Sequence, residues 1–161
     1  ALKHLSTDYS PNTSVLILSG DTPLVTTETM ELLLNDLENA KIMTTQVCDP
    51  SGYGRVVIED QHFQKIVEHK DCSQDELSIS IINTGIYAVS LKLLYNYVPQ
   101  IDNNNAQQEY YLTDLFGLLV SNRIPIQMYQ MPSENQLQLT GVNTKEQLEE
   151  LNKLLDKLNK H

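Results

Sequence analysis

The chain has 161 residues, a formal net charge of -10 and 40% hydrophobic residues, which suits one globular domain. The negative charge argues against nucleic acid as a partner, because phosphate backbones bind clustered Lys and Arg. No apolar run approaches the ~20 residues that a membrane helix needs. Its two cysteines, Cys48 and Cys72, lack metal-ligand spacing and fit reduced thiols. We therefore expect a soluble, cytoplasmic protein without membrane partners.

Apolar runs and helical spacing alternate along the first half of the chain. Met30, Leu33, Leu34 and Leu37, for example, recur at the spacing of one helix face. In chain order we predict a buried parallel strand over Ser14–Leu18, a helix over Thr26–Ala40, a strand over Lys41–Cys48, a turn over Asp49–Gly52, and a hairpin of Tyr53–Glu59 and Phe63–His69.

The second half continues the same alternation. We predict a strand over Ser78–Val89, a helix from Ser90 to about Val98, a polar loop over Asp102–Gln108, a helix over Tyr110–Val120, and strands over Pro125–Met131 and Gln136–Val142. Strands that alternate with helices indicate an α/β protein with a mostly parallel sheet.

The last segment has the clearest helical pattern. Thr144 can act as the N-cap, and Gln147 completes a capping box. One leucine stripe then follows at helical spacing, formed by Leu148, Leu151, Leu155 and Leu158. We predict a body over residues 1–143 and a C-terminal amphipathic helix over residues 144–161, which could also dock on another chain to form an oligomer.

Polar residues at predicted strand ends are the first candidates for chemistry. Asp21 follows a strand through Ser19 and Gly20, and ligands of open α/β sheets bind outside the carboxyl ends of strands. A carboxylate there can hold Mg²⁺, or it can cap a helix or serve the turn before Pro23. Asn143, after the last predicted strand, can likewise ligate a metal or simply precede the helix cap.

A second group of candidates surrounds the predicted hairpin. Gly52 and Gly54 can let backbone N–H groups approach a ligand, or can form a plain turn. Arg55 can hold a phosphate or pair with an acid. Glu68 can accept hydrogen bonds from sugar hydroxyls, or can belong to a solvated charge cluster.

Asn83 lies inside an apolar strand, two residues before Gly85. A buried amide needs partners, which can be a ligand or the backbone at a β-bulge. The chain contains no Ser/His/Asp triad pattern, no paired-cysteine site, no HExxH, no GxGxxG and no GxxxxGK[ST].

Read in order, several motifs resemble the bacterial N-acetylglucosamine-1-phosphate uridyltransferase domain. These motifs are LSGDTPL (18–24), PSGYGR (50–55), IVEHKD (66–71), INTGIY (82–87), NNNAQQEYYLTD (103–114) and GVN (141–143). The NNNAQQEYYLTD block is the most specific of them, whereas a GD pair after a strand is shared by many sugar nucleotidyltransferases. The resemblance runs from about Ser14 to the final helix.

The resemblance implies a Rossmann-like nucleotidyltransferase fold with a mostly parallel mixed sheet. It implies that UTP and N-acetylglucosamine 1-phosphate are joined to give UDP-N-acetylglucosamine, a cell-wall precursor, and pyrophosphate. Asp21 and Asn143 match the Mg²⁺ ligands and therefore catalytic positions. Gly54, Glu68 and Asn83 match sugar contacts, and Ser19 and Gly20 belong to the strand end beside the nucleotide.

Two departures from the family pattern modify this expectation. The Gly-rich triphosphate loop of the LAAGxGTRM kind does not occur here, so the sequence predicts an N-terminally truncated domain. Gln108 also stands where the family usually has Gly, which could narrow the sugar side of the pocket or have no effect if the side chain faces water. The alternatives to an enzyme are a non-catalytic sugar-nucleotide-binding module and an assembly subunit.

Overall fold

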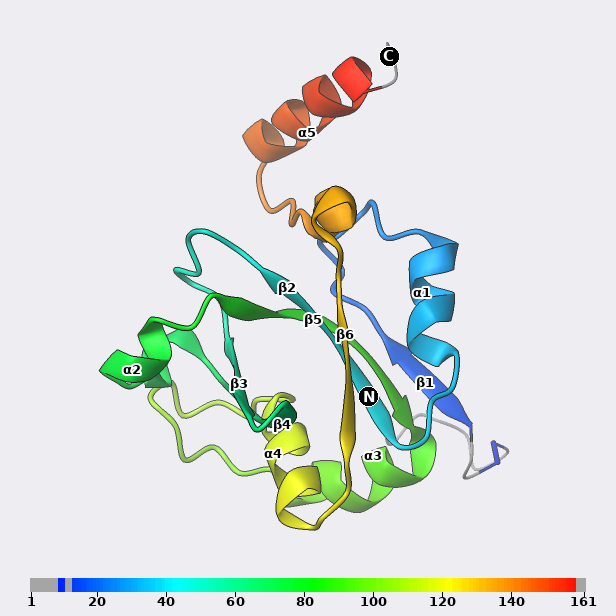
Figure 1. Cartoon of the computed structure of the whole chain (residues 1–161), viewed down its shortest axis with the longest axis vertical. Helices are drawn as coiled ribbons and strands as arrows, with labels where there is room; N and C mark the ends of the chain where they lie inside the picture. Colours follow the sequence, from blue (N-terminus) through cyan, green and yellow to red (C-terminus); the bar gives the residue numbers. More distant parts are fainter. Residues whose placement is uncertain (1–8, 11–12, 159–161) are drawn as a thin grey trace.

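The protein is built on one six-stranded sheet with helices on both of its faces (Figure 1). The structure is a computed structural model, and it describes residues 9–10 and 13–158. No helix in this described part is long and apolar enough to cross a membrane.

The strands are β1 (Ser14–Ile17), β2 (Ala40–Gln46), β3 (Arg55–Glu59), β4 (His62–Val67), β5 (Ile81–Ser90) and β6 (Ile126–Gln130). The α-helices are α1 (Thr27–Leu34), α2 (Gln74–Leu77), α3 (Leu91–Tyr97), α4 (Asp114–Ser121) and α5 (Lys145–Leu158). Three 3₁₀-helices also occur in the described chain, η2 (His69–Asp71), η3 (Val98–Gln100) and η4 (Ser133–Leu139).

The long strand β5 organises the sheet. The strand order is β4-β3-β5-β2-β6, and β1 also pairs with β5. β1, β2 and β3 all run antiparallel to β5, and β6 runs parallel to β2, so β1, β2, β3 and β6 point the same way. The mixed α/β sheet is therefore confirmed. The prediction that Ser14–Leu18 is a buried parallel strand is wrong for the described residues, because β1 is half-buried and antiparallel to β5.

Two apolar layers cover the faces of the sheet. Tyr87 and Val89 of β5 pack with α3 and α4, whereas Ile86 and Ala88 pack with Leu33 of α1. Successive side chains of a strand point to opposite faces, so a strand covered on both faces is apolar at every position. This explains why the sequence of β5 is continuously apolar from Ile86 to Val89.

Several predicted boundaries need correction. The helix predicted over Thr26–Ala40 ends at Leu34, since Asn35 is extended and Asp36 has a φ of 52°. The helix predicted from Tyr110 begins only at Asp114. The predicted hairpin is confirmed, but its turn is two residues long, Asp60 and Gln61, both with positive φ, because His62 already belongs to β4. Both cysteines are free.

The strand predicted over Gln136–Val142 is wrong, because this stretch begins in the 3₁₀-helix η4. Its alternating Gln and Leu residues imitate a strand, but the glutamine side chains bind other elements. Gln138 Oε1 accepts a hydrogen bond from the Thr29 hydroxyl at 2.7 Å, and Gln136 Nε2 donates to the Gln46 carbonyl at 3.0 Å. These bonds hold η4 against α1 and β2.

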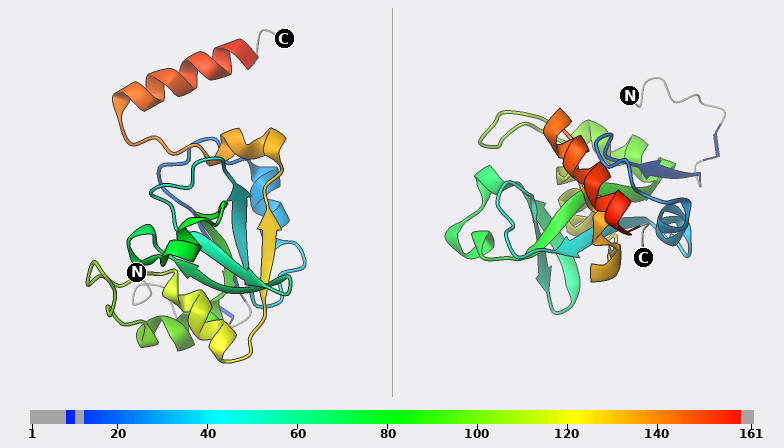
Figure 2. Two further views of the ribbon diagram at one scale, coloured as in Figure 1. Left: turned by 60° about the vertical axis from the view of Figure 1, so that its left-hand side comes forward. Right: turned by 90° about the horizontal axis from the view of Figure 1, so that it is seen from above.

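The C-terminal helix α5 begins with the predicted capping box. Gln147 N donates to the Thr144 hydroxyl at 3.2 Å, and Thr144 N donates to Gln147 Oε1 at 3.1 Å. Figures 1 and 2 show α5 set off from the sheet, after the loop that carries Asn143. Leu151 is 4% exposed whereas Leu148 is 45% exposed, so the leucine stripe is only partly covered; the Leu158 side chain lies outside the described residues.

Gln108 occupies a backbone conformation that suits glycine. Its φ is 55°. Its side chain is exposed and does not line the cavity described below, which favours the interpretation that Gln108 leaves the pocket unchanged. Only glycine adopts this left-handed region without steric cost. We expect Gln108→Gly to raise the free energy of unfolding by about 1 kcal/mol, measured by urea denaturation. Gln74→Gly in α2, where φ is helical, is the control and should lower the free energy of unfolding. A Gln108→Gly chain that is less stable than the parent would contradict the expectation.

Candidate functional site

A cavity of about 750 Å³ opens beside the end of β1 and the start of β3, and the loop before α5 also lines it. This volume lies within the usual range for small-molecule sites. Six of the seven predicted site residues line it, namely Ser19, Asp21, Gly54, Glu68, Asn83 and Asn143. Gly20 does not line the cavity and lies exposed between Ser19 and Asp21.

Asp21 and Asn143 are in contact in the lining of the cavity. Asn143 Nδ2 donates to Asp21 Oδ2 at 3.3 Å, although 122 positions separate the two residues in the chain. Val142 N also donates to the Asp21 carbonyl at 2.8 Å. A Cβ on Gly141 would lie 3.1 Å from Asp21 Oδ2, so glycine lets this loop approach the carboxylate closely. Asp21 therefore contacts the loop before α5 instead of capping α1, whose N-cap is Thr26.

Gly54, Glu68 and Asn83 form a second cluster in the lining of the cavity. Asn83 N donates to the Gly54 carbonyl at 2.9 Å. A Cβ on Gly54 would lie 3.3 Å from Glu68 Oε2 and 3.5 Å from Asn83 Cβ. The three residues thus form one continuous wall, in which a side chain on Gly54 would crowd its neighbours.

Glu68 and Asn83 are each held by a residue from a neighbouring element. The buried Thr113 hydroxyl donates to Glu68 Oε1 at 3.0 Å. The Tyr87 hydroxyl lies 2.8 Å from Asn83 Nδ2 and 3.0 Å from Asn83 Oδ1. Burial raises the pKa of Tyr87, so its hydroxyl stays protonated and able to donate. Both polar side chains of this wall are therefore fixed from behind.

Gly85 brings β5 against the end of β1. Its φ is 75°, and a Cβ there would lie 2.4 Å from the Ser19 hydroxyl oxygen. The register between β2 and β5 shifts at this point, which agrees with the β-bulge, one of the two alternatives that the sequence left open for Asn83. The bulge and the absent side chain together allow Ser19 and Asn83 to face the same cavity.

The cavity is acidic. Two of the described residues that line it are carboxylates, Asp21 and Glu68, and none of them is Lys, Arg or His. Close by, burial raises the pKa of Asp114, and the negative charges of Asp102, Glu68 and Asp71 raise it further. An anionic ligand would therefore need an added cation here. Within the described part of the chain, no group of three or more His, Cys, Asp or Glu residues is arranged to hold a metal by itself.

Arg55 supports the site from outside the cavity. Its guanidinium is buried, donates to the Tyr53 carbonyl, and lies 3.3 Å from His69 Nδ1. In the described residues it forms no ion pair, so the structure supports neither the phosphate nor the acid interpretation of Arg55. The guanidinium instead links the two loops that carry Gly54 and Glu68.

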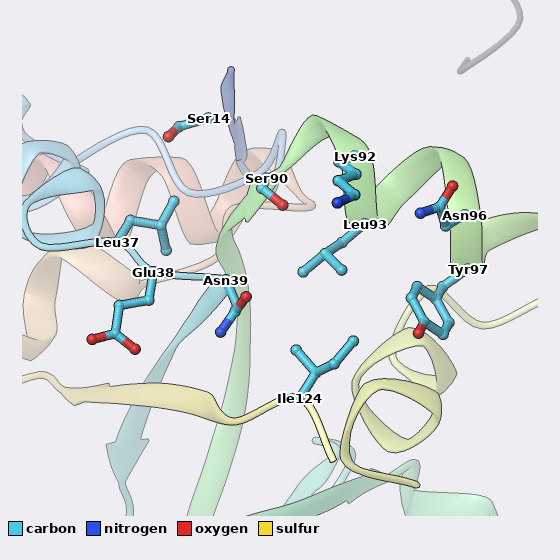
Figure 3. A pocket seen from close by; sticks show the side chains of 10 residues that line it. All are labelled: Ser14, Leu37, Glu38, Asn39, Ser90, Lys92, Leu93, Asn96, Tyr97 and Ile124. Carbon is cyan, nitrogen blue, oxygen red and sulfur yellow. The ribbon is translucent and has the colours of Figure 1, made fainter. Parts of the chain in front are cut away.

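A second hollow of about 600 Å³ lies at the opposite ends of the strands (Figure 3). Ser14 at the start of β1, Asn39 before β2, Ser90 at the end of β5 and Lys92 of α3 are among its lining residues. No predicted site residue reaches it, so the acidic cavity is the candidate site.

Comparison with known proteins repeatedly finds one type of protein. The "Bifunctional protein GlmU" of Clostridium beijerinckii is 43% identical over 145 residues, which are 88% of this chain and 31% of that protein. Those of Geobacillus sp. (strain WCH70) and Acinetobacter baylyi are 45% and 44% identical over 87% and 83% of this chain. None of the protein-family models searched matches.

The chain is of GlmU type. It spans about a third of the length of these GlmU relatives. Solved structures agree on the nucleotidyltransferase fold. A Bacillus anthracis protein described as a glucose-1-phosphate thymidylyltransferase, in complex with sucrose, matches with a TM-score of 0.61 at 23% identity, covering 89% of this chain and 55% of its own. CMP:2-keto-3-deoxy-manno-octonic acid synthetase complexed with CTP matches with a TM-score of 0.59 at 20% identity, covering 89% and 62%.

Sequence reasoning missed the residues that hold Glu68 and Asn83 from behind. Thr113 lies in the NNNAQQEYYLTD block, which carried the resemblance without assigning the threonine a role. Tyr87 looked like one more apolar residue of β5. Its position four residues after Asn83, across a glycine, was the only signal that the two side chains could meet.

Proposed function

We propose that this chain forms the sugar and metal-binding part of an N-acetylglucosamine-1-phosphate uridyltransferase. The observation that supports it best is the single acidic cavity that gathers Asp21, Asn143, Gly54, Glu68 and Asn83 from distant parts of the chain. The GlmU-type sequence and the nucleotidyltransferase fold favour transfer of a nucleotidyl group to a sugar phosphate.

The wall of Gly54, Glu68 and Asn83 suits an amino sugar. Glu68 Oε1 already accepts from Thr113, which leaves Oε2 beside Gly54 to accept from a ligand hydroxyl. Asn83 Oδ1 accepts from Gly85 N at 3.3 Å, and one N–H of the amide remains to donate. A sugar hydroxyl both donates and accepts, so it complements this pair of groups.

In the proposed reaction, a phosphate oxygen of N-acetylglucosamine 1-phosphate attacks the α-phosphorus of UTP in line. A new P–O bond forms, the bond between the α-phosphorus and the bridging oxygen breaks, and pyrophosphate leaves with that electron pair. The protein's own contribution is to hold the sugar so that its phosphate faces the nucleotide. Orientation of two bound reactants is a large source of rate.

Asp21 and Asn143 fit a hard divalent cation, which we propose is Mg²⁺. Carboxylate and amide oxygens suit Mg²⁺, and a site with two protein ligands leaves room for phosphate oxygens and water. Asn143 now turns its amide nitrogen toward Asp21, so holding the ion requires the amide oxygen to turn inward. A bound cation would neutralise phosphate charge in a cavity whose described lining has no cationic side chain.

The test is a calorimetric titration of the purified chain with UDP-N-acetylglucosamine, with and without Mg²⁺. We expect saturable binding that Mg²⁺ strengthens, and a loss of about 10- to 100-fold in Glu68→Ala, since hydrogen bonds to charged groups contribute ~1.5–3 kcal/mol. Glu59→Ala, which removes an exposed glutamate at the end of β3, is the matched control. A folded parent chain that gives no saturation, or a Glu68→Ala chain that binds as the parent does, would refute the proposal.

A second candidate function is a sugar-nucleotide-binding module without catalysis. It is favoured by the lack of any Lys, Arg or His among the described lining residues, because a triphosphate normally needs several positive partners. Pyrophosphate release from UTP and N-acetylglucosamine 1-phosphate distinguishes the two. Release by the chain supports the transferase, and binding without release supports the module.

A further inference from the structure

Asn83 has an unusual partner for a residue proposed to bind sugar. The Tyr87 hydroxyl lies 2.8 Å from its amide nitrogen and 3.0 Å from its amide oxygen. Gly85 N donates to the same amide oxygen at 3.3 Å, which settles which amide atom is oxygen. The hydroxyl can accept from the nitrogen and donate to the oxygen, so it holds the plane of the amide, while the bond from Gly85 N selects the orientation within that plane.

The Tyr87 ring is itself held firmly. Its side chain is 3% exposed, and it packs on Phe116 of α4 with ring centroids 4.7 Å apart. The ring lies on the same face of β5 as the core formed with α3 and α4. A phenol fixed in a packed core gives its hydrogen-bond partner a fixed position as well.

The helix α4 also reaches the second polar group of the wall. Thr113, its N-cap residue, donates to Glu68 Oε1 at 3.0 Å. Phe116, one turn along, supports Tyr87 and through it Asn83. The helix α4 therefore sets the relative positions of two polar groups. One is the Glu68 carboxylate, an acceptor after the end of β4, and the other is the Asn83 amide, a donor in β5.

We propose that Tyr87 is a positioning residue, which holds the Asn83 amide in place so that its remaining N–H is available to a ligand in the acidic cavity. The proposal rests on the sugar-binding function proposed above, since it assigns the purpose of that orientation. Of the described bonds of the Asn83 side chain, only the longer one from Gly85 N would remain without the Tyr87 hydroxyl, and the amide would be held less firmly. In the described structure Tyr87 is absent from the cavity lining, so it acts only through Asn83.

The experiment compares Tyr87→Phe with the parent chain by two readouts. The first is the side-chain amide signal of Asn83 in ¹⁵N-labelled protein without ligand, assigned by its loss in Asn83→Ala. The second is affinity for UDP-N-acetylglucosamine by titration. Tyr87→Phe keeps the ring on Phe116, and its thermal unfolding is recorded to show that it folds. Tyr129→Phe removes a hydroxyl from half-buried β6, outside the cavity lining, and is the matched control.

We expect Tyr87→Phe to shift the Asn83 amide signals, speed their exchange with water and weaken binding about tenfold, as for a polar group left without its partner. Tyr129→Phe should change neither readout. An unchanged affinity in Tyr87→Phe would overturn the proposal, whatever the amide signals do. If the parent chain itself fails to bind, the proposed function fails, and unaltered amide signals in Tyr87→Phe would then overturn the orienting role as well.

Discussion

Gly85→Ala is expected to lower the free energy of unfolding by about 2–5 kcal/mol, the largest stability effect we foresee for one methyl group. A left-handed backbone costs an L-residue ~1–2 kcal/mol, and overpacking costs a further ~1–3 kcal/mol. Both apply here, since φ is 75° and the new Cβ would lie 2.4 Å from the Ser19 hydroxyl oxygen. Urea denaturation measures the change.

Two comparisons separate these causes. Ser19→Gly combined with Gly85→Ala removes the steric contact and should recover only the overpacking part. Gly117→Ala lies in α4, where an added Cβ meets no atom within 4 Å, and should stabilise the chain, because glycine in a helix costs ~1 kcal/mol relative to alanine. A Gly85→Ala chain as stable as the parent would show that β5 does not need its bulge.

Asp21→Asn is expected to abolish the effect of Mg²⁺ on sugar-nucleotide binding and any Mg²⁺-dependent transfer. The substitution keeps the shape of the side chain but removes one of only two carboxylates in the described lining of the cavity. The amide oxygen of the new Asn can still accept from Asn143, so the change should cost at most ~1 kcal/mol of stability and the fold should persist. Titration with and without Mg²⁺ measures the result.

Asp156→Asn in α5 makes the same charge change on an exposed residue outside the cavity and should leave the Mg²⁺ effect intact. If Asp21→Asn retained a full Mg²⁺ effect, the ion would bind elsewhere, and the role proposed for Asn143 would fall with that of Asp21.

The strand pattern of the sequence accounts for the position of one candidate site residue. Asp21 was expected at a ligand site because it follows a strand, and it does line the cavity. Asn143 lines the same cavity although the strand predicted before it begins in η4, and Asn83 was placed inside a strand, so the strand-end rule explains neither. The contact of Asn83 with Tyr87 depends instead on the bulge at Gly85, which changes the local direction of β5 and leaves no mark in the apolar pattern.

Errors in the secondary structure have a similar origin. The alternating residues from Gln136 to Leu139 have the period of a strand, yet the segment forms η4 because Gln136 and Gln138 find partners on β2 and α1. Those partners lie about 90 to 110 positions away. Tertiary hydrogen bonds of this kind override a local pattern, and only the folded chain reveals them.

The first turn of α5 serves the helix and the site at once. Gln147 Oε1 accepts from Thr144 N in the capping box and also from Asn143 N at 2.7 Å, and Gln147 itself lines the cavity. Helix ends are the first parts of a protein to fray on warming. Fraying of this turn would release Asn143 from its position opposite Asp21. Ligand affinity should therefore decline at temperatures where the sheet is still intact, as though the site had a lower melting point than the domain that contains it.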